Sequence, residues 1–87
     1  MFVAEFSDGF KKQYKKLIKN NQVLEKRIDI ALAKLLTNPE AVSHKVGDAW
    51  SCRVTGDIRI IWEHKDGELT LLLIKIGGHS GKNSVYR

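Results

Sequence analysis

Three side chains in the last third of the chain have the chemistry needed to handle a phosphate group and its protons. Arg59 stands inside the apolar run of residues 58–62, His79 follows a pair of glycines, and Tyr86 is next to last. A guanidinium binds phosphate oxygens through a planar fork. An imidazole exchanges protons near neutral pH, and an aromatic ring stacks on an exposed base. The combination predicts a phosphate-handling site, and nothing else in the sequence offers comparable chemistry.

Each of these residues also has a plain structural interpretation, which the sequence leaves open. Alternation along the strand puts Arg59 on the same face as Glu63, so an ion pair with Glu63 or Asp57 would satisfy its charge. His79 taken alone would be an ordinary solvated loop residue. Tyr86 could pack the tail onto the sheet instead of stacking on a base.

Further basic residues surround the three. Arg53 is expected on the preceding strand beside Arg59, where two guanidinium groups repel each other unless an anion lies between them. Lys82 and Arg87 flank Tyr86, with no acidic residue nearby. This arrangement strengthens the prediction that the partner is a polyanion.

Composition limits the classes of protein to which the chain can belong. With 87 residues, it is expected to form a single domain over 1–87, and its 43% of hydrophobic residues suffices for a core. Cys52 is the single cysteine, which excludes an intramolecular disulfide, and the histidines are too dispersed for metal-ligand spacing. We therefore expect no metal and no cofactor.

The net charge indicates the kind of partner. A formal charge of +5 favours nucleic acid or a very acidic protein. The alternative is a solvated, lysine-rich surface, because five lysines crowd the first predicted helix. They are Lys11, Lys12, Lys15, Lys16 and Lys19.

No targeting or membrane segment is expected. The longest apolar stretch, residues 71–74, is far too short to span a bilayer. Residues 1–5 lack the basic segment and apolar run of a secretory signal. A reducing, cytoplasmic location is the default expectation.

The first half of the chain predicts a short strand followed by two helices. Residues 2–6 alternate weakly, and Ser7 is suited to cap the helix that follows. The apolar faces comprise Phe10, Tyr14, Leu17 and Ile18 in the first helix and Leu24, Ile28, Ala31, Leu32, Leu35 and Leu36 in the second. Residues 20–21 and 38–39 end the two helices, and so short a link predicts an antiparallel hairpin.

After a loop through residues 47–48 the apolar period becomes that of strands. Residues 50–54 alternate, a turn at 56–57 leads into residues 58–64, and Asp66-Gly67 predicts a tight hairpin into residues 69–76. We therefore expect an α+β domain in the order β-α-α-β-β-β. Its mainly antiparallel sheet would carry the helical hairpin on one face.

The order and spacing of these motifs resemble the RelE/ParE superfamily of bacterial toxins from type II toxin–antitoxin systems. A strand of the form Gly-x-x-Arg-apolar-apolar-aromatic corresponds to residues 56–62, and a strand ending in Gly-His followed by Val-Tyr corresponds to residues 78–86. The resemblance covers essentially the whole chain and implies a RelE-like fold.

The resemblance also implies roles for five residues, in the manner of the RelE and YafQ-like members. Arg59 would stabilise charge on the phosphorane-like transition state, Tyr86 would stack on or orient the message, and His79 would act as general acid or base. That branch also has a second histidine, in the loop before the second strand. The sequence around His44 nearly matches the motif of that histidine, so His44 is another acid or base candidate. Asp57 would position a histidine or the nucleophile.

The remaining basic positions would bind RNA. Arg53 falls where relatives carry a basic residue or a histidine, and Lys45, Lys82 and Arg87 complete the set. Many relatives have an arginine directly after the histidine of the last strand. This chain has Ser80 there, and Lys82 lacks the bidentate fork of an arginine.

The implied function is that of an mRNA interferase, an endoribonuclease that cuts ribosome-bound message without a metal, through attack of the RNA 2′-hydroxyl on the adjacent phosphate. The implied partners are a cognate antitoxin in a hetero-oligomer, mRNA and the 70S ribosome, with no membrane. One alternative is a ParE-like toxin that poisons DNA gyrase without nuclease activity. Another is a non-catalytic basic module that binds RNA or the ribosome.

Overall fold

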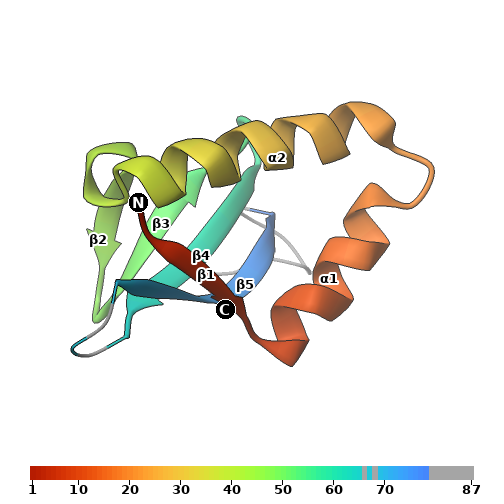
Figure 1. Cartoon of the computed structure of the whole chain (residues 1–87). Coiled ribbons are helices and arrows are strands. Elements are labelled where there is room, and N and C mark those ends of the chain that lie inside the picture. The colour runs from red at the N-terminus through yellow and green to blue at the C-terminus, as the bar shows by residue number, and fades with distance from the viewer. Residues whose placement is uncertain (66, 68, 79–87) are drawn as a thin grey trace.

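Two α-helices and a five-stranded sheet make up the described part of the chain, residues 1–65, 67 and 69–78 of the computed structural model. Figure 1 shows their arrangement. In chain order the elements are β1 (Val3–Phe6), α1 (Asp8–Ile18), α2 (Gln22–Thr37), the 3-10 helix η1 (Glu40–Val42), β2 (Ser43–Val46), β3 (Ala49–Arg53), β4 (Ile58–His64) and β5 (Thr70–Gly78). The predicted α+β class is confirmed.

Side-chain caps fix where the two helices begin. Ser7 Oγ accepts a hydrogen bond from the Phe10 backbone N–H at 3.0 Å, and Asn21 Oδ1 accepts one from the Leu24 N–H at 3.1 Å. Each bond satisfies one of the backbone donors that a helix start leaves unpaired. Asn20 lies in the turn between the helices with a positive φ of 56°, a conformation that asparagine tolerates better than most residues. The predicted helical hairpin is confirmed.

The strands lie in the order β1-β5-β4-β3-β2. All neighbours are antiparallel except β1 and β5, which run parallel with Val3 opposite Thr70 and Phe6 opposite Leu73. Parallel neighbours must be joined by a crossover connection. Here the chain from β1 to β5 passes through the helical hairpin first and then through the other three strands. The first strand is therefore added at one edge of the sheet, as predicted.

The second strand was not expected and corrects the predicted element order. The sequence assigned residues 43–46 to a loop, whereas β2 pairs with β3 from Ser43 opposite Cys52 to Val46 opposite Ala49. Gly47, with a φ of 61°, begins the two-residue turn that joins β2 to β3. The indole N–H of Trp62 donates to Ser43 Oγ at 3.0 Å and further anchors this edge. His44 therefore lies in a strand.

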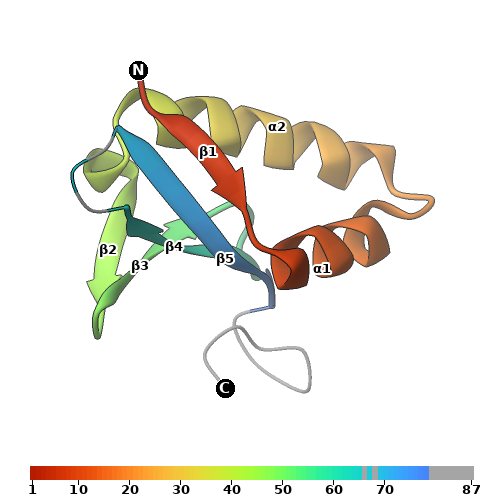
Figure 2. The ribbon, with the colours of Figure 1, turned by 60° about the horizontal axis from the view of Figure 1, so that its bottom comes forward.

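A single apolar core fills the space between the sheet and the helices, which lie on the same side of the sheet (Figures 1 and 2). Its fully buried members come from both helices and three strands: Phe10, Ile28, Leu35, Cys52, Ile60, Trp62, Leu71, Leu73 and Ile76. The opposite side of the sheet is called the helix-free face below. No helix in the described residues is long and apolar enough to cross a membrane.

A bulge in β5 reverses the side-chain alternation of that strand. Lys75 lies opposite Ile61, yet the next residue of β4, Trp62, lies opposite Leu73, so Ile74 is an extra residue in the ladder. Because of this extra residue, Leu73 and Ile76 both reach the core although they differ in parity. Lys75 is turned to the helix-free face.

Candidate functional site

Two arginines face each other across adjacent strands on the helix-free face. Arg53 in β3 lies directly opposite Arg59 in β4, and Arg59 in turn lies opposite Gly77 in β5. Residues opposite one another in such a ladder have Cβ atoms about 4.5–5.5 Å apart. Arg53 is exposed, whereas Arg59 is buried, with a residue exposure of only 7%. Because both side chains are positively charged, an anion between their guanidinium groups would relieve the repulsion.

The guanidinium of Arg59 is anchored to the main chain of the turn that precedes its strand. Its Nη1 donates to the Thr55 carbonyl at 2.5 Å and, less closely, to the Ile58 carbonyl at 3.4 Å. The ion pairs between described residues are His64–Glu40 and Lys65–Glu5, so no carboxylate within this part of the chain neutralises Arg59. A guanidinium has five N–H donors, and the bonds described engage Nη1 alone.

The turn at residues 54–57 is organised around a threonine. Thr55 Oγ1 accepts hydrogen bonds from the backbone N–H groups of Asp57 at 3.2 Å and Ile58 at 3.0 Å. This fixes the reversal that the sequence predicted at 56–57, and it holds the Thr55 carbonyl where Arg59 can reach it. Asp57 is exposed at the same end of the sheet as the arginine pair.

The structure separates His44 from its neighbour Lys45. His44 lies opposite Ser51 and therefore shares the helix-free face with Arg53, one diagonal step away. Lys45 lies opposite Trp50, with its Nζ 5.1 Å from the centre of the indole ring. The sheet thus brings His44 together with the arginines and places Lys45 on the other face.

Four of the predicted site residues lie outside the described residues: His79, Lys82, Tyr86 and Arg87. Ser80, where relatives carry an arginine, is also outside. β5 ends at Gly78, which lies opposite Ile58 at the end of the ladder, and His79 is the next residue in the sequence.

Sequence reasoning missed one basic residue on this face, Lys75. Counting by twos from Leu71 and Leu73, which are both fully buried, would place Lys75 in the core. A lysine at a core position is a signal for an irregular strand, because lysine is almost never fully buried without a partner. The bulge at Ile74 resolves the conflict, and Lys75 is exposed beside Ile61.

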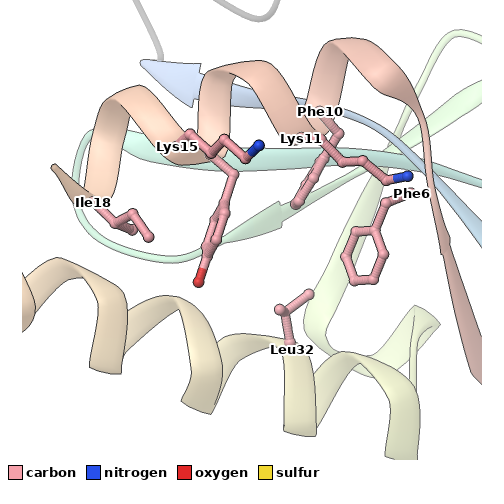
Figure 3. A pocket seen from close by; sticks show the side chains of 7 residues that line it. Phe6, Phe10, Lys11, Lys15, Ile18 and Leu32 are labelled. Atoms are coloured by element: carbon pink, nitrogen blue, oxygen red, sulfur yellow. The ribbon is translucent and has the colours of Figure 1, made fainter.

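A separate apolar groove of about 470 Å³ lies on the helical side of the molecule. Its lining residues are Phe6, Phe10, Lys11, Tyr14, Lys15, Ile18 and Leu32. Figure 3 shows Leu32 of α2 facing the aromatic rings that come from β1 and α1. Burial raises the pKa of Tyr14, and the negative charges of Asp29 and Glu25 add to the rise. The groove is an apolar channel with lysines at its rim.

Comparison with solved structures identifies the fold. The chain aligns with a metal-bound toxin from Helicobacter pylori at 28% identity and a TM-score of 0.74, covering 91% of this chain and 96% of that one. It aligns with the RelBE toxin–antitoxin complex of E. coli at 16% identity, TM-score 0.74, covering 93% and 100%. It aligns with the YoeB/ParE toxin of Agrobacterium tumefaciens at 15% identity and a TM-score of 0.77, covering 91% of this chain and 100% of that one. The fold is that of the RelE-like toxins.

Residues 4–82 match the family described as the ParE toxin of the type II toxin–antitoxin system, parDE. The chain therefore belongs to this family and is a type II toxin of the RelE/ParE superfamily. No curated protein matches the chain. Within the residues described here, no group of three or more His, Cys, Asp or Glu side chains could hold a metal ion.

Proposed function

We propose that this toxin is a ribosome-dependent endoribonuclease that arrests translation by cutting mRNA in the cytoplasm. The observation that carries the proposal is the cross-strand pair of Arg53 and Arg59, which no carboxylate of the described residues neutralises. A phosphodiester placed between the two guanidinium groups would relieve their repulsion, and its negative charge grows as the transition state forms.

In the proposed reaction the RNA itself supplies the nucleophile, and no metal takes part. A base removes the proton of the 2′-hydroxyl, and the resulting oxygen attacks the adjacent phosphorus. The bond to the 5′-oxygen then breaks, and an acid protonates that leaving oxygen. The products are a 2′,3′-cyclic phosphate, which can open to a 3′-phosphate, and a 5′-hydroxyl end. Both proton transfers suit an imidazole near neutral pH.

The proposed roles follow from chemistry and position. Arg59 and Arg53 hold the phosphate, and His79 and His44 are the candidates for acid and base. Of these two histidines, His44 is placed on the helix-free face by its pairing with Ser51. Asp57 positions a histidine or the nucleophile. Lys82, Arg87 and Lys45 contribute attraction to the message.

A base contact completes the proposed site. Tyr86 stacks on a base of the message, and alanine substitution at such a contact typically costs about 1–3 kcal/mol in single-strand binders.

Expression in bacteria tests the proposal. Wild-type protein should arrest growth, whereas Arg59→Ala and His79→Ala should each relieve the arrest by removing charge stabilisation or proton transfer. Arg27→Ala, an exposed arginine on α2, is the matched control and should arrest growth like the wild type. If arrest survives both active-site changes, a non-catalytic basic module that binds RNA or the ribosome becomes the better account.

A second function is favoured by the family to which the chain belongs, whose description names the ParE toxin. In that case the protein would act by binding DNA gyrase. The ribonuclease and the gyrase inhibitor can be distinguished by assaying translation and gyrase supercoiling with the same protein preparation. The ribonuclease proposal requires translation to be blocked while supercoiling by gyrase proceeds normally.

The apolar groove is the proposed docking site for a cognate antitoxin. Relatives in the solved structures form complexes with antitoxins, among them RelBE of E. coli and YoeB–YefM of Staphylococcus aureus. Lys11 and Lys15, one helical turn apart on the rim, fit an amphipathic segment with an apolar face and acidic side chains. Such a segment would cover the aromatic floor and pair with both lysines.

Charge reversal tests this docking site. Lys11→Glu with Lys15→Glu should weaken capture of the protein encoded beside this gene at least tenfold. The control reverses Lys12 and Lys16, which have the same spacing and helix but do not line the groove. Equal loss in both double variants would show that only overall charge matters, and the groove assignment would then be wrong.

A further inference from the structure

The bulge in β5 is tied to the start of α1, so the position of Lys75 is fixed by two elements. The hydroxyl of Ser7 donates to the carbonyl of Ile74, the extra residue of the bulge, at 2.7 Å. The same oxygen accepts the capping bond from Phe10 at 3.0 Å. A bulge re-aims the side chains next to it. Here it turns Lys75 out of the core and onto the helix-free face.

On that face Lys75 lies next to Arg59. Lys75 is opposite Ile61, two residues along β4 from Arg59, while Arg59 is opposite Gly77, two residues along β5 from Lys75. Diagonal neighbours of this kind are about 7–8 Å apart, within reach of long side chains. Glu63 lies two residues beyond Ile61 on the same face, and no ion pair joins it to Lys75 or Arg59 among the described residues.

Lys75 thus extends the arginine pair into a row across four neighbouring strands, made of His44 in β2, Arg53 in β3, Arg59 in β4 and Lys75 in β5. Each step is one direct or one diagonal ladder position. His44, Arg53 and Lys75 are exposed, whereas Arg59 between them keeps only 7% exposure. Neither Arg53 nor Lys75 is in an ion pair between described residues. We call this set the cationic row.

We propose that the cationic row is a track for the backbone of single-stranded RNA, which crosses the sheet perpendicular to the strands, and that Lys75 binds a phosphate next to the one held by Arg59. The proposal rests on the proposed function for the identity of the ligand. A lysine suits this position because it binds phosphate as a mobile point charge, whereas the planar fork of arginine suits the reacting phosphate.

Single-stranded RNA fits the row better than a rigid duplex does. The row follows the twist between strands, roughly 20–25° from one strand to the next, and a flexible single strand can follow it.

Binding of RNA phosphates releases counterions, so each phosphate contact contributes about 0.7 to the slope of log affinity against log salt concentration.

The test measures binding of a short, single-stranded RNA by fluorescence anisotropy over a range of salt concentrations. Its nucleotides carry 2′-deoxy substitutions at the sites of cleavage, so that binding is measured without reaction. Lys75→Ala should lower the affinity several-fold at low salt and reduce the salt slope by about 0.7, the loss of one phosphate contact. Lys75→Arg should retain most of the affinity.

Lys26→Ala is the matched control, because Lys26 is an exposed lysine on α2, which packs on the opposite side of the sheet. It should bind like the wild type. The inference is overturned if Lys75→Ala and Lys26→Ala have the same affinity and slope, or if the wild type does not bind the RNA at low salt. It is also overturned if Lys75→Ala weakens binding only to duplex DNA.

The binding test of Lys75 and the cleavage test of the proposed function can fail independently. Cleavage by the wild type together with unchanged binding by Lys75→Ala would remove the track and leave the ribonuclease in place. Weakened binding by Lys75→Ala, in a protein that never cuts RNA, would support the track and remove the ribonuclease.

Discussion

Arg59 has a structural role and a proposed functional role, and a single substitution removes both. Its guanidinium bonds the Thr55 carbonyl and so holds the turn before β4, and its remaining donors are proposed to hold a phosphate. Arg53, across the ladder, is exposed and has no such anchor among the bonds described. The pair therefore offers a way to separate structural loss from functional loss.

We predict that Arg59→Ala lowers stability by about 1.5–3 kcal/mol, the usual cost of losing a hydrogen bond to a charged group. Arg53→Ala should change stability by no more than about 0.5 kcal/mol, as exposed substitutions usually do, yet still reduce RNA cleavage at least tenfold. Chemical denaturation and a cleavage assay on the same preparations measure both effects. Full activity in Arg53→Ala would show that the two arginines do not share a phosphate.

Cys52 gives the protein a predictable sensitivity to alkali. Burial raises the pKa of its thiol above the ordinary value of 9.0, although a hydrogen bond with Ser43 partly opposes the shift. Above pH 9 the unfolded chain therefore loses this proton while the native protein keeps it. Since the native state then binds more protons, the free energy of unfolding falls as pH rises, by at most about 1.4 kcal/mol per pH unit, until the native thiol also ionises.

Cys52→Ala should lack the part of the fall in unfolding free energy at alkaline pH that comes from the thiol. The measurement is the stability difference between wild type and Cys52→Ala under reducing conditions, followed from pH 7 to above pH 9. The gap should be constant at lower pH and shrink as the pH passes the ordinary thiol value. A gap that stays constant throughout would mean that the thiol ionises equally in both states.

At the scale of elements, the helices were predictable because their signals are local. Ser7 caps the first helix as expected, and the apolar stripes of both helices run at helical spacing. Residues 20–21 were expected only to end the first helix, and Asn21 also caps the second. The turn at 56–57 together with strand alternation was enough to place Arg53 beside Arg59. These features depend on residues close together in the sequence.

Two features escaped prediction, each for its own physical reason. β2 is only four residues long, and its exposed middle gives no apolar alternation, so its pairing depends on β3 and on the bond from Trp62 to Ser43. The bulge at Ile74 depends on the ladder with β4 and on the hydroxyl of Ser7. Ser7 and Ile74 are 67 residues apart in the chain, so no local pattern signals their contact, and Lys75 was missed for that reason.

The double role of Ser7 gives a prediction at this scale. Ser7→Ala removes both the cap of α1 and the bond to the bulge, so it should cost about 1–2 kcal/mol. Asn21→Ala removes only an exposed cap of α2 and should cost about 0.5–1 kcal/mol. Urea denaturation of both variants provides the comparison. Equal costs would mean that the bond to Ile74 contributes nothing measurable.

At the scale of the whole molecule, two groups of basic side chains among the described residues lie on different surfaces. Lys11 and Lys15 of α1 border the apolar groove, and the cationic row crosses the opposite face of the sheet. On the proposed assignments, an acidic antitoxin segment and RNA use different surfaces. An antitoxin seated only in the groove would leave the row exposed, so neutralisation would require contacts that reach the helix-free face.

The most direct test of the central claim is to map the 5′ ends of a defined message after purified protein is added to a reconstituted translation reaction. The account predicts new ends within the reading frame, bearing 5′-hydroxyl groups, with wild-type protein and not with Arg59→Ala. A message that stays intact on translating ribosomes, while the same preparation inhibits supercoiling by gyrase, would contradict it.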